Sequence, residues 1–213
     1  MAACRSGTKY IHEVLKSLGV NCGHETVYSE LGYLGWANYQ VDVSCWSPYY
    51  FKREHGDDIN ILHQTRNPVD SINSNASHWE HFLNDLFSKP NESILVQIDH
   101  QNHPRMAQVG TPLEKAVVYY TGHNSMIEER HSPVLRYAVE GMTLETVKLI
   151  LSYIDGVVGV SDARIEEVLS SMPKDNNPLP DYVNRGMYNY TFNELPDIQE
   201  KSVLATLIQN YGY

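Results

Sequence analysis

A short turn that could bind an anion begins at the fifth residue of the 213-residue chain, with Arg5-Ser6-Gly7-Thr8-Lys9. It runs into the segment Thr8 to Leu18, whose apolar residues recur at helical spacing. Backbone N–H groups and the positive end of the dipole at a helix start bind phosphate or sulfate oxygens. The sequence therefore predicts an anion cradle; the alternative is an ordinary helix start. Its expected members are Arg5, Ser6, Gly7, Thr8, Lys9 and Tyr10.

The turn differs from the nucleotide-triphosphate loop G-x-x-x-x-G-K-[ST]. The first glycine of that pattern is missing, and Thr8 separates Gly7 from Lys9. Tyr10 also stands where a Mg²⁺-binding hydroxyl would follow the lysine. A nucleotide or small-molecule kinase is therefore an alternative function rather than the preferred one.

A second cationic site follows the stretch Ile59 to Thr65, which reads as a mostly buried strand. Arg66 comes directly after this strand, and Ser74 lies eight positions later, in a helix that begins near Pro68. Ligands gather at the carboxyl ends of the strands in parallel α/β sheets. Two anion sites on neighbouring strand ends would suit a ligand with two separated phosphates, although Arg66 could instead form a surface ion pair.

Both sites resemble motifs of the sulfotransferases that use 3′-phosphoadenosine 5′-phosphosulfate (PAPS). The stretch "CRSGTKY" resembles their 5′-phosphosulfate loop, and "RNPVDSINS" resembles their 3′-phosphate motif. "SPVLRYAVEGM" looks like a later strand of the family, and the last 24 residues resemble the tail of bacterial sugar-directed members. The resemblance implies one α/β domain over residues 1–213, a P-loop NTPase-like three-layer sandwich with a central parallel sheet. It also implies PAPS as donor, no metal, and an acceptor hydroxyl, expected on a carbohydrate.

The resemblance assigns roles to individual residues. Arg5 and its loop would hold the 5′-phosphosulfate, while Arg66 and Ser74 would hold the 3′-phosphate. "CGHET" is similar to the "CGEET" of tyrosylprotein sulfotransferases, which places Glu25 as the catalytic base with His24 beside it. The alternatives are a structural Glu25 and a merely hydrogen-bonded His24. The family's C-terminal R-K-G-x-x-G-D-W segment has no match, but Arg185 in "VNRGMYNY" could assist in binding the nucleotide.

The strands and helices predicted from the sequence alternate along the chain, which favours a parallel sheet. Only Met1 to Cys4 precede the first turn, so the strand there must be very short. Ser132 to Glu140 reads as a further strand, on which Arg136 and Glu140 are expected to pair. Tyr28 to His55 has no clean period and is interpreted as an insertion near the active cleft. Further helices are expected over residues 112–129, 143–154, 162–172 and from about Pro196.

Composition limits the classes of function. The net charge of −10, from 26 acidic and 16 basic residues, argues against nucleic acid as the main partner. No apolar run is long enough to cross a bilayer and no signal peptide is recognised, so a cytoplasmic protein is expected.

Cys4, Cys22 and Cys45 have no metal-type spacing and are expected to be reduced. A catalytically inactive nucleotide-binding module remains an alternative, and the oligomeric state is open.

Two other groups of side chains allow more than one interpretation. The histidine pairs His78/His81 and His100/His103 could share a metal, but no acidic or Cys cluster completes either site. His63 is expected at the edge of the core. Aromatic residues in the insertion suit either a core or a sugar-bearing acceptor: Trp36, Trp46, Tyr49, Tyr50 and Phe51.

Overall fold

The computed structural model describes residues 1–3, 5–29, 32–36, 38–52, 59–87, 103–172 and 188–213, without side chains for 78–87. The predictions made for Cys4, His78, His81, His100 and Arg185 therefore lie outside the described residues or side chains. Within the described parts of the chain, no helix is both long enough and apolar enough to span a membrane.

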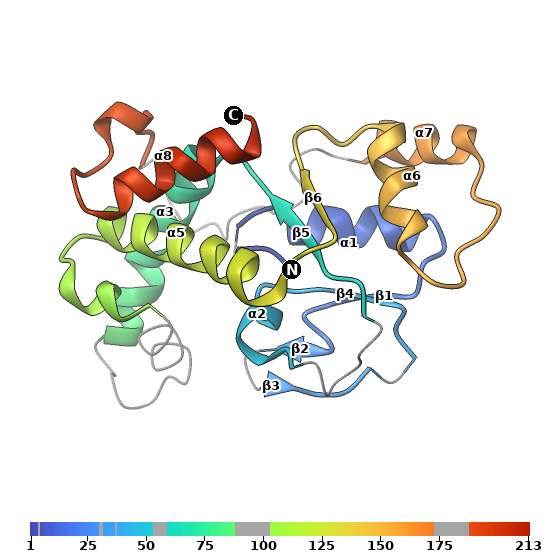
Figure 1. Cartoon of the computed structure of the whole chain (residues 1–213), viewed down its shortest axis with the longest axis horizontal. Helices are drawn as coiled ribbons and strands as arrows, with labels where there is room; N and C mark the ends of the chain where they lie inside the picture. The colour runs from blue at the N-terminus through green and yellow to red at the C-terminus, as the bar shows by residue number, and fades with distance from the viewer. Residues whose placement is uncertain (4, 30–31, 37, 53–58, 88–102, 173–187) are drawn as a thin grey trace.

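The chain combines helices with small parallel sheets of short strands (Figure 1), which confirms the coarse α/β class. The helices are α1 (Thr8–Ser17), α2 (Ser47–Tyr50), α3 (Pro68–Phe87), α5 (Pro112–His131), α6 (Leu144–Ser152), α7 (Asp162–Ser171) and α8 (Glu200–Tyr211), with 3-10 turns η2 (Pro104–Gln108) and η3 (Phe192–Glu194). The strands are β1 (Cys22–His24), β2 (Tyr28–Ser29), β3 (Gly32–Tyr33), β4 (Val41–Val43), β5 (Leu62–Thr65) and β6 (Leu135–Ala138).

The described strands form separate two-stranded sheets rather than one continuous sheet. β5 pairs with β6 in parallel, and Ala2 adds a parallel bridge to Gln64 on β5. β1 and β4 form a second parallel pair, while β2 and β3 are antiparallel. The P-loop-like three-layer sandwich with a single central sheet thus remains a prediction.

The carboxyl ends of β1 and β5 both lie near the loop before α1. At the carboxyl end of β1, the ring of His24 contacts Thr8. After the carboxyl end of β5, the side chain of Arg66 contacts the carbonyl of Arg5. Both sheets therefore deliver side chains to one loop, Arg5 to Thr8, as the sequence predicted for neighbouring strand ends.

Apolar side chains hold the layers together in separate clusters. In Figure 1, α3, α5 and α8 lie on one side of β5 and β6, and α1, α6 and α7 lie on the other. Each fully buried aliphatic side chain contributes about 1.5–3 kcal/mol to folding. Buried members of the first cluster, between α3, α5 and α8, include Ile72, Tyr120 and Leu204. The second cluster, between α1, α6 and α7, includes Ile11, Ile150 and Ile165. A smaller third cluster includes Val27, Tyr28 and Phe51.

Local signals explain where the helices begin. Thr111 caps α5 through a capping box with Glu114, and Pro112 occupies its first turn. The hydroxyl of Thr143 accepts a hydrogen bond from Thr146 N at 3.2 Å, which caps α6. The expected helices starting near Thr8, Pro68, Pro112, Thr143 and Asp162 are confirmed.

Two expectations about strands need correction. The two predicted strands are shorter than expected, with four residues each in β5 and β6. The expected Arg136–Glu140 pair is wrong: Arg136 Nε donates to Glu128 at 2.8 Å. β6 ends at Ala138, so Glu140 lies in the following turn and no longer shares a strand face with Arg136.

Candidate anion-binding site

The loop before α1 has a backbone that suits an anion. Arg5 has φ of +64° and Gly7, the N-cap of α1, has φ of +79°. No side chain caps the helix at this position. Turns of this kind, with a left-handed residue ahead of free helix N–H groups, form anion-binding concavities. The first turn of α1 therefore offers backbone donors together with the helix dipole.

Glycine is required at position 7 for two reasons. Its positive φ is a conformation that side-chain-bearing residues rarely adopt. A Cβ atom there would also lie 3.0 Å from Cγ2 of Val139, just after β6. The close approach of Val139 means that the end of β6 helps to set the shape of the loop.

Neighbouring strands hold the loop carbonyls in place. Ser6 N donates to Ala3 O at 3.2 Å, and the side-chain amide of Gln64 donates to Ser6 O. Tyr137 in turn donates from its hydroxyl to Gln64 Oε1 at 3.1 Å. Ser6 N–H is thus engaged within the chain, and the N–H groups that remain for a ligand are those at the start of α1, from Gly7 onward.

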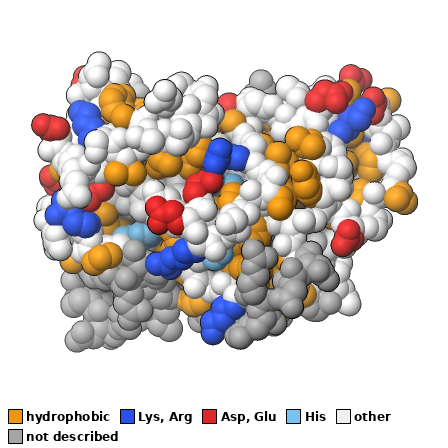
Figure 2. Space-filling view, viewed as in Figure 1, with side chains coloured by type: hydrophobic (Ala, Val, Ile, Leu, Met, Phe, Trp, Pro, Cys, Tyr) orange, Lys and Arg blue, Asp and Glu red, His pale blue; other side chains and the backbone are white. Residues whose placement is uncertain are grey.

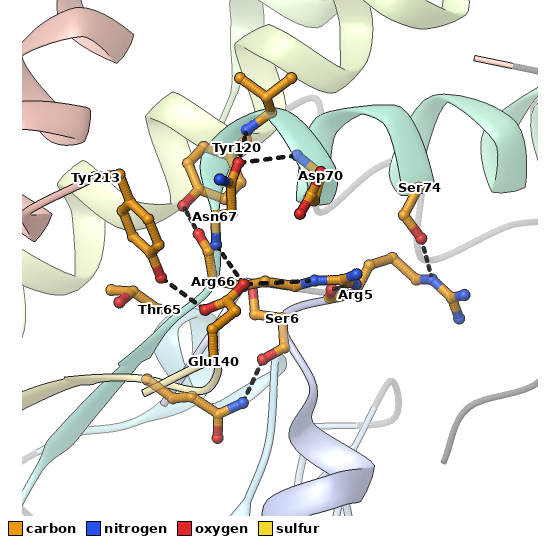
Figure 3. A network of polar contacts seen from close by, with 12 residues as sticks. Arg5, Ser6, Thr65, Arg66, Asn67, Asp70, Ser74, Tyr120, Glu140 and Tyr213 are labelled. Carbon is orange, nitrogen blue, oxygen red and sulfur yellow. Dashed lines mark hydrogen bonds and ion pairs between the residues drawn. The ribbon is translucent and has the colours of Figure 1, made fainter. Parts of the chain in front are cut away.

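The two predicted anion motifs meet in space (Figure 3). Arg5 Nε donates to Ser74 Oγ on α3 at 3.1 Å, and Arg66 Nη1 donates to Arg5 O at 3.0 Å. Figure 3 shows the Arg66 side chain reaching the backbone of Arg5, and the Arg5 side chain continuing toward Ser74 on α3. Arg5 thus lies beside Arg66 and Ser74, which are about 60–70 positions later in the chain. Together they form a cationic site with the Ser74 hydroxyl at its edge.

Ser6 provides an independent sign of a ligand group. Its side chain is 1% exposed, and its hydroxyl has no hydrogen-bond partner among the described residues. A buried, unpaired hydroxyl costs about 1–3 kcal/mol. An anion oxygen in the loop would remove this cost, so the residues present fit a phosphate or sulfate group.

Other predicted loop residues differ in their placement. Thr8 is buried and its Oγ1 contacts His24 Nε2 at 3.1 Å. Lys9 is exposed at the surface. Tyr10 is half-buried against the cluster around α1, α6 and α7, and burial raises the pKa of its hydroxyl. A contribution of Tyr10 to a ligand would therefore come from its backbone.

A network on the far side of Arg66 fixes the second motif. Glu140 Oε1 accepts from Asn67 N at 2.7 Å and lies 3.9 Å from Arg66 Nε. Tyr213 donates to Glu140 Oε2 at 2.8 Å, and Tyr120 donates to the carbonyl of Arg66 at 3.0 Å. Figure 3 shows Glu140 between Tyr213 and the arginines. Sequence reasoning missed this network, whose members come from four segments that are distant in the chain.

His24 and Glu25 follow β1 but have different partners. The ring of His24 reaches the loop through Thr8. Glu25 has φ of +55°, its N donates to Val43 O at 3.2 Å, and Cys45 Sγ donates to Glu25 Oε1 at 3.1 Å. Among the described contacts, His24 rather than the Glu25 carboxylate touches the anion loop.

A buried chain of histidines supports the segment just before the loop. His123 Nε2 donates to Ala2 O at 3.1 Å, so its Nδ1 accepts from the Tyr49 hydroxyl at 3.0 Å. His103 Nε2 then donates to Tyr49 at 3.3 Å. Tyr49 thus belongs to the core network rather than to an open acceptor cleft. His63 is fully buried and bonded to Asn124 and Glu128, deeper in the core than expected.

Charged groups elsewhere are dispersed. Figure 2 shows acidic and basic side chains interspersed on the face in view, with hydrophobic side chains between them. In the described residues, no group of three or more His, Cys, Asp or Glu side chains is arranged to hold a metal. Cys22 and Cys45 are buried and carry reduced thiols.

Comparisons with protein-family models, with curated proteins and with solved structures gave no match. The function must therefore be argued from the arrangement of the side chains. The site combines an uncapped helix start, an unpaired hydroxyl and two arginines. The chemistry of such a set suits an oxyanion, since Arg can supply paired donors to two of its oxygens.

Proposed function

We propose that this chain is a PAPS-dependent sulfotransferase that transfers a sulfuryl group to an acceptor hydroxyl, with a carbohydrate as the expected acceptor. The observation that carries the proposal is the direct contact between its two anion motifs, Arg5 with Ser74 and Arg66 with Arg5. PAPS carries phosphate groups at both ends of its ribose, so it requires two neighbouring anion sites. The resemblance of both motifs to those of the sulfotransferases supports the same assignment.

The residues have distinct tasks in the proposed reaction. Arg5 and the N–H groups at the start of α1 would stabilise the charge that develops on the departing 5′-phosphate. Arg66 and Ser74 would bind the 3′-phosphate and orient the donor. When bound, PAPS supplies the sulfuryl group: the acceptor O–S bond forms as the S–O bond to the phosphate breaks, and the electron pair leaves with the phosphate.

Glu25 would take the proton of the acceptor hydroxyl as that bond forms. His24 would hold the Thr8 hydroxyl and so position the loop, consistent with their 3.1 Å contact. Glu25→Gln should lower the transfer rate at least 100-fold, because general-base catalysis contributes ~10²–10⁴-fold. The affinity for the product 3′-phosphoadenosine 5′-phosphate (PAP) should stay unchanged.

One observation favours a second candidate function, a nucleotide-binding module without turnover. The described partner of the Glu25 carboxylate is the Cys45 thiol rather than any residue of the loop. Such a module would bind PAP through Arg5 and Arg66 but would transfer no sulfuryl group.

Transfer of ³⁵S from labelled PAPS to a panel of mono- and oligosaccharides tests the proposal. Incorporation by the wild-type chain, lost in Glu25→Gln, is the expected result. PAP binding with no incorporation across the panel would favour the binding module. Incorporation that survives in Glu25→Gln would show that another group takes the proton.

A further inference from the structure

Two buried Ser hydroxyls have no hydrogen-bond partner among the described residues, those of Ser6 and Ser71. Ser6 belongs to the anion loop, where the candidate site accounts for it. Ser71 lies in the first turn of α3 and is 0% exposed, and no feature of the site described so far accounts for it. Because burial of a hydroxyl without a partner is unfavourable, Ser71 is a candidate contact for a ligand.

Ser77, in the same helix, shows how a buried helical Ser ordinarily pairs. Its Oγ donates to the carbonyl of Asn73, four positions earlier, at 2.9 Å. The equivalent carbonyl for Ser71 is that of Asn67, which accepts from Ser71 N at 2.9 Å. The Ser71 hydroxyl takes no part in that contact. Ser71 therefore lacks the local hydrogen bond that satisfies the buried Ser77 hydroxyl.

Helical geometry turns the Ser71 side chain toward the anion loop. Successive residues of a helix are about 100° apart around its axis, which puts Ser71 between Ser74 on one side and Ile72 on the other. Ser74 accepts a hydrogen bond from Arg5, and Ile72 packs in one core cluster with Ala3. The face of α3 that carries Ser71 is therefore directed at the residues that lead into the loop.

The same face connects the two residues assigned to the 3′-phosphate. Arg66 precedes the first turn of α3, and Ser74 lies in its second turn. Figure 3 shows the Ser74 side chain directed from α3 toward Arg5. Ser71 and Ser74 are one turn apart, with about 5–6 Å between their Cβ atoms. A phosphate that contacts both Arg66 and Ser74 would lie over the turn that contains Ser71.

We propose that Ser71 is a further binding residue for the 3′-phosphate of PAPS, with its hydroxyl donating to the group that Arg66 and Ser74 also bind. The inference rests on the proposed function, because PAPS and its product PAP are the ligands. Ser71 is fully covered in the structure, and Arg5 contacts Ser74 on the same face of α3. Phosphate binding would turn the Arg5 side chain toward the 5′-phosphosulfate and uncover the Ser71 hydroxyl.

A hydroxyl of this kind lowers the stability of the fold and strengthens binding. Its burial cost is recovered when a phosphate oxygen accepts its proton in a hydrogen bond, and hydrogen bonds to charged groups are the stronger ones. Loss of the Ser71 hydroxyl should therefore raise stability and lower affinity. A Ser with a purely structural role would lose stability on the same change.

Ser71→Ala and Ser77→Ala test the inference in the full chain as a matched pair. Both variants gain the same helix propensity, but Ser77→Ala also loses a described hydrogen bond. We expect Ser71→Ala to melt at least ~2 °C above the wild type. By isothermal titration calorimetry it should bind PAP at least tenfold more weakly. Ser77→Ala should melt below Ser71→Ala and bind PAP as the wild type does.

Phosphorus NMR identifies the phosphate that Ser71 contacts, because the two phosphates of PAP give separate ³¹P signals. In samples saturated with PAP, the 3′-phosphate signal should differ between the wild type and Ser71→Ala. The 5′-phosphate signal should change less, since the loop before α1 holds that group.

Four results would overturn the inference. Wild-type affinity in Ser71→Ala, together with weaker binding in Arg5→Ala, would leave the proposed function standing without Ser71. A Ser71→Ala chain that is both less stable and weaker in binding would make Ser71 a support of the fold. A change confined to the 5′-phosphate signal would assign Ser71 to the other phosphate. No PAP binding by the wild type would contradict the proposed function and this inference together.

Discussion

Arg5 and Ser74 are joined by a 3.1 Å hydrogen bond although 69 positions separate them in the chain. The bond links the loop before α1 to the first half of α3. Arg66 completes the link by donating to the carbonyl of Arg5. The two motifs therefore lie next to each other, as a ligand with two phosphates requires.

Arg5→Ala should weaken the binding of PAP at least tenfold. Hydrogen bonds to charged groups contribute about 1.5–3 kcal/mol, and the variant also leaves Ser74 without its described donor. Arg5→Lys should recover only part of the affinity, because an ammonium group lacks the paired donors of a guanidinium. Isothermal titration calorimetry measures both values.

Arg164→Ala is the matched control for this loss of positive charge. Arg164 pairs with Glu167 on α7 and donates to Ser17 O at the end of α1 opposite the loop, so its loss should not affect PAP binding. An equal loss of affinity in Arg164→Ala would show that net charge, and not the site, determines binding.

Gly7→Ala should lower both the free energy of unfolding and the affinity for PAP. The left-handed backbone at position 7 costs a side-chain-bearing residue about 1–2 kcal/mol, and the new Cβ would crowd Val139. Gly19→Ala is the control, since Gly19 has φ of +86° but no atom within 4 Å of an added Cβ. Urea titrations should show a loss for both variants, with weaker PAP binding only for Gly7→Ala. Unchanged PAP binding in Gly7→Ala would exclude the loop as the anion site.

Glu140→Ala should reduce the free energy of unfolding by about 1 kcal/mol, because Asn67 N and the Tyr213 hydroxyl lose their acceptor. Glu140→Gln keeps an acceptor oxygen and should lose less. The amide signal of Asn67 in a ¹⁵N correlation spectrum should shift most in Glu140→Ala. If the two variants have equal stability and equal Asn67 shifts, these hydrogen bonds do not hold the second motif.

Stability should fall as the pH is lowered below about 6.5. Burial lowers the pKa of His103 to about 4, with Arg130 adding to the effect, and burial keeps the pKa of His123 well below its ordinary value. Both rings are neutral in the folded chain but take up protons when it unfolds. Their contribution is complete above pH ~6.5 and is lost toward pH 4, at up to ~2.7 kcal/mol per pH unit for two protons.

His103→Gln should reduce the slope by up to ~1.4 kcal/mol per pH unit, since one titrating group is removed. His123, His63 and His12, whose pKa values burial also lowers, retain their part of the slope. Urea titrations between pH 7 and 4.5 provide the measurement. A slope that is unchanged in the variant would show that His103 is not held neutral by its buried position.

The helices were predictable because their signals are local. The apolar stripe at Ile11, Val14 and Leu15 and the cap at Thr143 lie within a few positions of the backbone that they organise. The short strands β1 and β4 were not predictable, since three residues are too few to show a period. Their pairing depends on contacts between distant segments.

The arginines and Ser74 were found from the sequence because their spacing matches known anion motifs. Glu140 was assigned the wrong partner, since the end of β6 at Ala138 decides which side chains share a face. Tyr213 gave no signal: its contact with Glu140 arises only when α8 packs against α5 and returns the chain to Arg66. Such partners depend on tertiary structure, which a linear motif does not contain.

The most direct test of the central claim is a calorimetric titration of the purified chain with PAP, compared with ATP and Mg²⁺ under identical conditions. The proposed site predicts saturable PAP binding with one site per chain. PAP binding should be at least tenfold weaker in Arg5→Ala, and ATP with Mg²⁺ should not bind. PAP should also raise the melting temperature. No binding of PAP, or equal binding of both nucleotides, would contradict the assignment.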